Sequence, residues 1–191
     1  DDAAQKIQRS KCFDNATSCS SENALIVVDA VYDECIAALQ RVGGMVLDPA
    51  QTNHLINTHW HDGHLNRDIL AQDIEAVLCT LGLTNIAPQN TKFLVAPAHG
   101  IGPNYPISGE KMALFLALYR ASDFADAKRK ARAIHDYQGR GHSLGLHSHD
   151  DKRAHELAMD MQACRIIVNQ AHCFATGGSF DNGLPFSLSM G

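Results

Sequence analysis

The stretch Ala24-Leu25-Ile26-Val27-Val28-Asp29 decides the fold class of this chain. Its five apolar residues predict a short strand, and Asp29 is a typical N-cap for a following helix. That helix has one apolar face and a glycine stop, formed by Val31, Cys35, Ile36, Leu39 and Gly43-Gly44. A strand that leads directly into an amphipathic helix is the repeating unit of α/β proteins.

The same alternation continues outward from this stretch. Further strands are predicted at residues 92–96, 113–119, 143–147 and 165–168. Further helices are predicted at residues 66–81, 122–137 and 150–162, the first from Asn66 to a stop at Gly82. Strands that alternate with helices predict an α/β sheet with helices packed on it.

Composition excludes several classes of protein. The chain has 191 residues, a formal net charge of -5 and 45% hydrophobic residues, which suffices for a core in one domain or at most two. Its basic residues cluster only at 128–132, where apolar residues interrupt them, so we expect no nucleic-acid partner. No apolar run approaches the roughly 20 residues of a membrane span, so we expect no membrane partner. The 6 cysteines lack CxxC spacing, which favours reduced thiols and a cytoplasmic location.

One cysteine lies where a nucleophile would. Cys19 stands among small polar residues in the segment 13–23, immediately before the predicted strand at 24–28. A reactive thiol needs access, backbone N–H donors for an oxyanion and a rigid support. The position of Cys19 offers all three.

A second motif competes with this interpretation. Residues 59–64 contain His59, His61 and His64, and three imidazoles at this spacing suit zinc. The segment resembles the His-x-His-x-Asp-His motif of metallo-β-lactamases, but Asp62 and Gly63 are exchanged. We therefore interpret it as a surface turn without metal, and a zinc hydrolase of that fold remains the alternative enzyme.

The whole chain resembles the catalytic domain of the aldehyde dehydrogenase superfamily, in its coenzyme A acylating branch. The matching segments are 11–23, 102–111, 116–120, 139–143, 164–170 and 177–185. Segment 169–183 is most similar to the sulfoacetaldehyde dehydrogenase type, with succinate semialdehyde and simple aldehyde enzymes close behind. The resemblance implies a three-layer sheet with helices on both faces, and it makes residues 60–66 an ordinary family turn.

The resemblance also implies a mechanism. Cys19 would attack an aldehyde, its own N–H would bind the oxyanion, hydride would pass to NAD or NADP, and coenzyme A would take the acyl group. His142 matches a histidine near the thiol, and Glu110 matches a glutamate that binds the cofactor ribose. The expected substrate and coenzyme A pocket, on the loop after the last strand, comprises Asn169, Thr176, Gly177, Gly178 and Asn182. The acidic residues are assigned to helix caps, helix faces or the ribose, which leaves none to activate water.

The chain lacks the Gly-rich dinucleotide loop of this family, so we expect residues 1–191 to be an excised catalytic domain that is inactive alone. The full enzyme is expected to be a homo-oligomer that acts on a small aldehyde. A domain kept only for oligomer assembly is the non-enzymatic alternative. Cys19 is expected to alkylate fastest, because Cys35, Cys79 and Cys164 lie on apolar stripes and should be buried.

Overall fold

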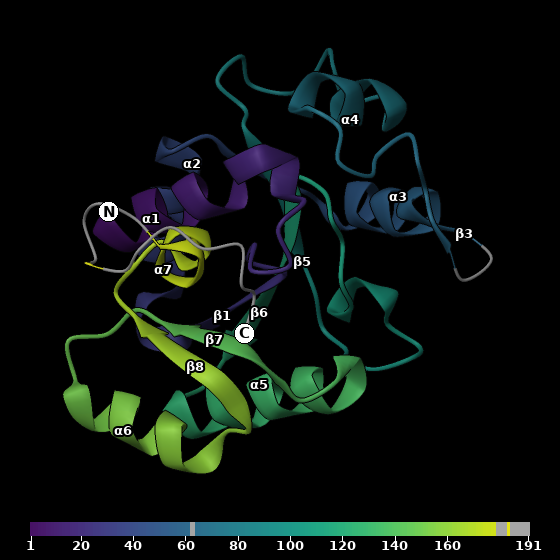
Figure 1. Cartoon of the computed structure of the whole chain (residues 1–191). Helices are drawn as coiled ribbons and strands as arrows, with labels where there is room; N and C mark the ends of the chain where they lie inside the picture. The colour runs from purple at the N-terminus through teal and green to yellow at the C-terminus, as the bar shows by residue number, and fades with distance from the viewer. Residues whose placement is uncertain (62–63, 179–182, 184–191) are drawn as a thin grey trace.

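A parallel sheet forms the centre of the computed structural model, which describes residues 1–61, 64–178 and 183 (Figure 1). In spatial order its strands are β1 (Ala24–Val28), β6 (Phe115–Ala121), β5 (Phe93–Pro97) and β2 (Gly44–Val46). The register places Ala24 of β1 opposite Ala117 of β6. Parallel strands that are covered on both sides form continuous apolar runs, and β5 and β6 have this composition.

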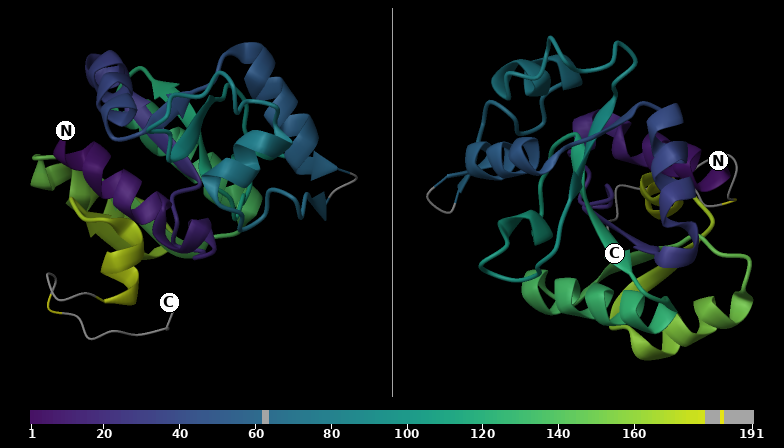
Figure 2. Two further views of the ribbon diagram at one scale, coloured as in Figure 1. Left: turned by 90° about the horizontal axis from the view of Figure 1, so that it is seen from above. Right: turned by 180° about the vertical axis from the view of Figure 1, so that it is seen from behind.

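Helices cover both faces of this main sheet (Figure 2). The helices of the two outer layers are α1 (Asp2–Lys11), α2 (Tyr32–Arg41), α3 (Pro49–His59) and α4 (Ile74–Thr80). Phe93 and Val95 of β5 enter the core with α1 and α2, whereas Leu94 and Ala96 enter the core with α3 and α4. Successive residues of a strand point to opposite faces, so one strand serves both cores. The predicted three-layer α/β architecture is confirmed.

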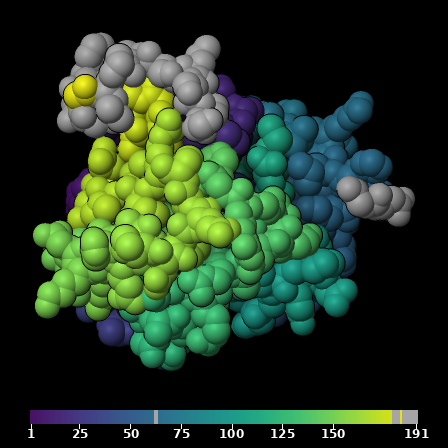
Figure 3. All heavy atoms as spheres, turned by 60° about the horizontal axis from the view of Figure 1, so that its bottom comes forward, coloured from purple at the N-terminus to yellow at the C-terminus, as the bar shows by residue number. Residues whose placement is uncertain are grey.

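A small parallel sheet lies beside the main one. It and its helices comprise β7 (Gly141–Leu146), β8 (Ala163–Val168), α5 (Phe124–Gln138) and α6 (Asp151–Asp160). Its core is small and is built around Ala131, Leu157 and Met161. Because α5 also contacts β1 and β6, this helix joins the two sheets. Figure 3 shows α6 and β8 gathered on one face of the molecule.

Short elements complete the described chain. They are the hairpin β3 (Trp60–His61) and β4 (His64–Leu65), the 3₁₀ turns η1 (Phe13–Ala16), η2 (Asp29–Val31) and η3 (Pro106–Ser108), and the helix α7 (His172–Gly177). α7 packs on α1, where the Cys173 N–H donates a hydrogen bond to Ser10 Oγ at 2.9 Å. The segment after the last strand therefore returns to the beginning of the chain.

Two predicted helices begin later than expected. Asn66 does not start a helix, because its side chain accepts from the Asp68 N–H and forms a turn. Helix α4 begins only after Asp73, whose side chain accepts from the Ala76 N–H at 2.8 Å. Asp29 likewise opens a 3₁₀ turn rather than α2, which leaves Val31 exposed outside the apolar face.

Other elements were not predicted at all. The strand β2 and the helices α3 and α7 are short or only weakly amphipathic, so their hydrophobic periodicity is indistinct. None of the helices among the described residues is both long and apolar enough to cross a membrane.

Candidate active site

Cys19 lies in a tightly folded loop between α1 and β1, and its side chain is half-buried. Earlier in the loop, Asp14, Asn15 and Ala16 have φ angles of 49°, 50° and 61°. Consecutive left-handed residues other than glycine are unusual and must be held by their surroundings. Thr17 Oγ1 supplies one such restraint, since it donates to Asp14 O at 2.9 Å. The cysteine is therefore presented by a defined loop rather than by a loose one.

His142, near the start of β7, brings an imidazole to this thiol. Its Nε2 atom is 3.2 Å from Cys19 Sγ, although the two residues are 123 positions apart. Its Nδ1 atom accepts a hydrogen bond from the Ser143 backbone N–H at 2.8 Å. A neutral imidazole carries one proton, so an accepting Nδ1 places that proton on Nε2, facing the sulfur. The two sequence-predicted catalytic residues are thus in direct contact.

The sequence analysis missed a pair of charged residues at the two ends of this loop, fully buried Lys11 and half-buried Glu22. Lys11 ends α1 and Glu22 precedes β1, so the two residues flank the Cys19 loop, and burial is the main influence on both. Burial lowers the pKa of Lys11 to about 8 and raises the pKa of Glu22 to about 7. For Glu22 this shift is opposed by the Ser10 hydroxyl, by nearby backbone N–H groups and by Lys11.

The assignment of every acidic residue to caps, helix faces or the ribose is therefore wrong for Glu22. Its Oε2 atom is buried and makes no hydrogen bond within the described part of the chain. One feature of the sequence could have indicated Glu22: it follows Cys19 by 3 residues and lies just before an apolar strand.

Glu110 lies on the surface after η3, and its backbone N–H donates to Gln138 Oε1 at 2.9 Å. The neighbouring Lys111 is completely buried instead, with Nζ donating to Gly109 O at 2.6 Å. Burial lowers the pKa of Lys111 well below its ordinary value. Glu110 thus presents its carboxylate to solvent from a firmly anchored backbone.

The predicted pocket loop is only partly a loop. Thr176 and Gly177 belong to α7, and Thr176 Oγ1 donates to the carbonyl oxygens of His172 and Cys173, so its side chain binds its own helix. Asn169 does follow β8, but its amide bridges both backbone groups of Ser148.

The last two residues of that predicted pocket are glycine and asparagine. Gly178 ends α7 with a φ of 84°, a conformation that glycine adopts without strain. Asn182 lies outside the described residues. The helix was missed because Ala, Thr and Gly in its sequence do not form an apolar stripe.

The cysteines are not distributed as predicted. Cys79 and Cys164 are exposed and Cys35 is half-buried, so the expectation of buried thiols was wrong for the first two. Burial raises the pKa of Cys12, Cys35 and Cys173. Access alone therefore does not distinguish Cys19. What distinguishes it is the imidazole at 3.2 Å.

The histidine cluster at 59–64 does not converge on one point. His59 is fully buried at the end of α3, where its Nε2 lies 2.9 Å from Lys111 O, and burial lowers its pKa to about 4. His61 and His64 are exposed and face each other across the β3–β4 register. A surface turn was expected here, but the burial of His59 was not. No group of three potential metal ligands occurs within residues 1–61, 64–178 and 183.

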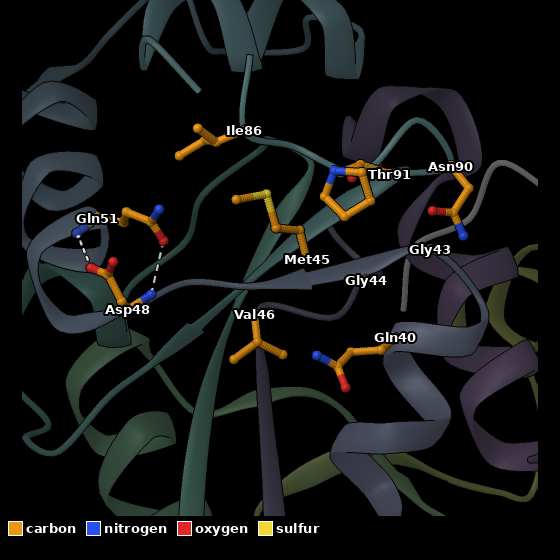
Figure 4. A pocket seen from close by; sticks show the side chains of 11 residues that line it. Gln40, Gly43, Gly44, Met45, Val46, Asp48, Gln51, Ile86, Asn90 and Thr91 are labelled. Carbon is orange, nitrogen blue, oxygen red and sulfur yellow. Dashed lines mark hydrogen bonds between the residues drawn. The ribbon is translucent and has the colours of Figure 1, made fainter. Parts of the chain in front are cut away.

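A cavity of about 440 Å³ lies elsewhere, beside the edge strand β2 (Figure 4). It is lined from the segments 40–51 and 86–91, and Asp48 and Gln51 cap α3 at its rim. Neither segment carries a predicted site residue, so this cavity is separate from the Cys19–His142 contact.

Solved structures define the class to which this arrangement belongs. An acetylating aldehyde dehydrogenase from Geobacillus thermoglucosidasius matches with a TM-score of 0.86 and 31% identity, over 91% of this chain and 38% of that one. A propionaldehyde dehydrogenase from Clostridium phytofermentans matches with a TM-score of 0.85 and 25% identity, over 97% and 41%. The chain is therefore a domain of the coenzyme A acylating aldehyde dehydrogenase family.

Two similar proteins are both named sulfoacetaldehyde dehydrogenase (acylating). Sulfoacetaldehyde dehydrogenase (acylating) from Cupriavidus necator is 48% identical over 191 residues, which is all of this chain and 39% of that protein. The enzyme of the same name from Bilophila wadsworthia is 34% identical over all of this chain and 42% of its own length. The chain thus spans about two fifths of these relatives. No protein-family model matches it.

Proposed function

We propose that residues 1–191 form the catalytic domain of an acylating aldehyde dehydrogenase in which Cys19 is the nucleophile. The observation that carries this proposal is the 3.2 Å contact between Cys19 Sγ and His142 Nε2. It joins a thiol on a defined loop to an imidazole, and a Cys–His pair is a common arrangement at nucleophilic cysteines.

The proposed reaction begins with attack of the Cys19 sulfur on the aldehyde carbon, which forms a thiohemiacetal. In this proposal the Cys19 N–H and the His142 Nε2–H donate to the developing oxyanion, and the contact of His142 Nε2 with the sulfur supports the second donor. A nicotinamide cofactor, when bound, supplies the acceptor for the hydride. Loss of hydride leaves a thioester on Cys19.

Coenzyme A is the proposed acceptor of this acyl group. His142 Nε2–H would polarise the thioester carbonyl by donating to its oxygen, because that atom faces the sulfur; the coenzyme A thiolate attacks the carbonyl carbon and Cys19 leaves as the thiolate. Hydrolysis would need a carboxylate able to reach water at the thioester. Glu22 does not suit this role, since its Oε2 atom is buried.

The proposed nicotinamide cofactor is inferred from the exposure of Glu110. The exposed carboxylate of Glu110 suits a ribose diol, which donates two hydrogen bonds, and NAD and NADP are both compatible with this contact.

The substrate we propose is sulfoacetaldehyde, because two relatives at 48% and 34% identity are named as sulfoacetaldehyde dehydrogenases. Asn169 and Gly178 remain candidates for the pocket wall, together with Asn182. We further propose a cytoplasmic homo-oligomer, in keeping with 6 free cysteines.

Burst kinetics test the proposed function in the whole enzyme that carries this chain. With aldehyde but without coenzyme A, about one equivalent of reduced nicotinamide should form per active site and turnover should then stop. Cys19→Ala should abolish the burst, whereas Cys164→Ala, at another exposed thiol, should preserve it. His142→Ala should slow acyl transfer by about 10²- to 10⁴-fold. Sustained formation of free acid without coenzyme A would contradict the acylating assignment.

Thiol mapping gives a second test that needs no substrate. A short iodoacetamide pulse near neutral pH should modify Cys19 before Cys79 and Cys164, although all three are accessible. The two exposed cysteines serve as internal controls for access. Equal labelling of the three would remove the case for an activated thiol.

A further inference from the structure

We propose that His172 is a positioning residue that fixes the orientation and proton of His142 through Ser143; the inference rests on the role of His142 proposed above. His172 begins α7, and its Nε2 atom lies 2.6 Å from Ser143 Oγ. The same Oγ atom lies 3.1 Å from His142 Nδ1. A continuous chain of contacts therefore leads from His172 through Ser143 and His142 to Cys19.

The protons in this chain can be placed. Ser143 offers two donors to the single lone pair of His142 Nδ1, its backbone N–H at 2.8 Å and its hydroxyl at 3.1 Å. The hydroxyl has one proton, so it turns toward His142 only if His172 Nε2–H donates to its oxygen. With His172 in that tautomer, His172 Nε2–H donates to Ser143 Oγ and the Ser143 hydroxyl donates to His142 Nδ1. The proton of His142 is then on Nε2, which faces the Cys19 sulfur.

His172 suits a fixed donor because it is held in place. Its side chain is 8% exposed, and burial, followed by the nearby His142, lowers its pKa to about 4, so the ring stays neutral. The next residue anchors α7, since the Cys173 N–H donates to Ser10 Oγ. An uncharged ring on an anchored helix can define the position of a more exposed neighbour.

Strand β7 leaves room for this ring. A Cβ atom added to Gly145 would lie 3.0 Å from His172 Nδ1, closer than ordinary packing allows. Gly145 is on the same strand as His142 and Ser143, so the strand that carries the imidazole also accommodates its buried partner. A side chain at position 145 should push against the His172 ring and weaken its contact with Ser143.

The test measures the tautomer of His142 directly, by ¹⁵N chemical shifts of the imidazole ring in the whole enzyme. The unaltered enzyme should show His142 protonated at Nε2 and His172 protonated at Nε2. His172→Phe should release His142 into a mixture of tautomers, and His172→Gln should restore the first state, because the Gln Nε2 amide can donate to Ser143 Oγ. His155→Gln, on the exposed face of α6, is the matched control and should change neither ring.

Kinetics provide the second readout. His172→Phe should lower kcat by about 10- to 100-fold, as loss of an outer hydrogen-bond partner does elsewhere, with little change in KM for the aldehyde. His172→Gln should recover most of that loss. Gly145→Ala should produce a smaller loss in the same direction. Where His172→Phe fails to fold, Ser143→Ala removes the hydroxyl link but keeps the backbone N–H donor to His142 Nδ1, so it should shift the His142 tautomer in the same direction, but not further than His172→Phe does.

The outcomes separate this inference from the proposed function. An unchanged His142 tautomer in both His172→Phe and Ser143→Ala would overturn the positioning role, even with Cys19 essential. An Nδ1–H tautomer of His172 in the unaltered enzyme would overturn it as well. Retained activity in Cys19→Ala would instead overturn the function while leaving the tautomer result valid.

Discussion

The two sheets of this molecule differ in how deeply they are buried, and the proposed active site lies where they meet. Residues 93–96 of β5 and 115–117 of β6 are 0% exposed, whereas the start of β7, with His142, is exposed. Cys19 belongs to the loop that leads into the main sheet. The 3.2 Å contact with His142 is therefore a contact between a loop that leads into the buried sheet and an exposed part of the small one. Chemistry needs polar groups that reach a substrate, and a strand buried on both faces cannot supply them.

The largest difference between the sheets should appear on truncation of apolar side chains. Phe115→Ala in β6 removes a fully buried ring from the main core and should cost about 3–5 kcal/mol. Leu144→Ala in β7 removes a half-buried side chain and should cost roughly 1–2 kcal/mol. Hydrogen exchange of β5 and β6 amides in the whole enzyme measures the first loss, and that of β7 and β8 amides the second. Equal losses would mean that the small sheet is as essential to stability as the main one.

Lys11 and Glu22, which flank the Cys19 loop in the sequence, should make the stability of this region sensitive to pH. Burial raises the pKa of Glu22 from 4.5 to about 7, so the folded state holds its proton more tightly than the unfolded state does. The stability from Glu22 is thus fully present below pH 4.5 and is lost as pH rises through about 7. The loss is at most about 3 kcal/mol.

Glu22→Gln isolates this effect, because the amide cannot titrate. The melting temperature of the enzyme relative to that of Glu22→Gln should fall between pH 4.5 and 7. Glu75→Gln, at an exposed glutamate of α4, should leave the pH profile unchanged. Lys11 acts in the opposite direction at higher pH: its pKa is lowered to about 8, so its contribution is full above pH 10.5 and is lost as pH falls to about 8. A relative melting temperature that rises from pH 4.5 to 7 would contradict the burial of Glu22.

The same contrast explains what sequence could predict. β5 and β6 could be predicted because burial on both faces demands apolar runs, and the half-buried edge strand β1 has the same apolar composition. Cys19 could be predicted because it lies in a polar loop directly before β1. The short helix α7 was not, since Ala, Thr and Gly give no periodic stripe. His172 and Glu22 were missed because their burial arises from contacts with distant segments, which neither residue type nor spacing reveals.

The smallest predicted effect tests whether the small sheet opens independently of the main one. Asp150 caps α6 by accepting from the Lys152 N–H at 3.0 Å, and α6 packs on β8. Loss of such a cap costs about 1 kcal/mol, and the deficit should be confined to the part that opens with α6. In Asp150→Ala, exchange of β7 and β8 amides should therefore accelerate about fivefold, while β5 and β6 stay unchanged. Asp73→Ala, at the cap of α4, which packs on the core of the main sheet, is the matched control and should leave β7 and β8 unaffected. If Asp150→Ala accelerates both sheets alike, α5 couples them into one cooperative unit, and His142 is held against Cys19 by the stability of the whole domain.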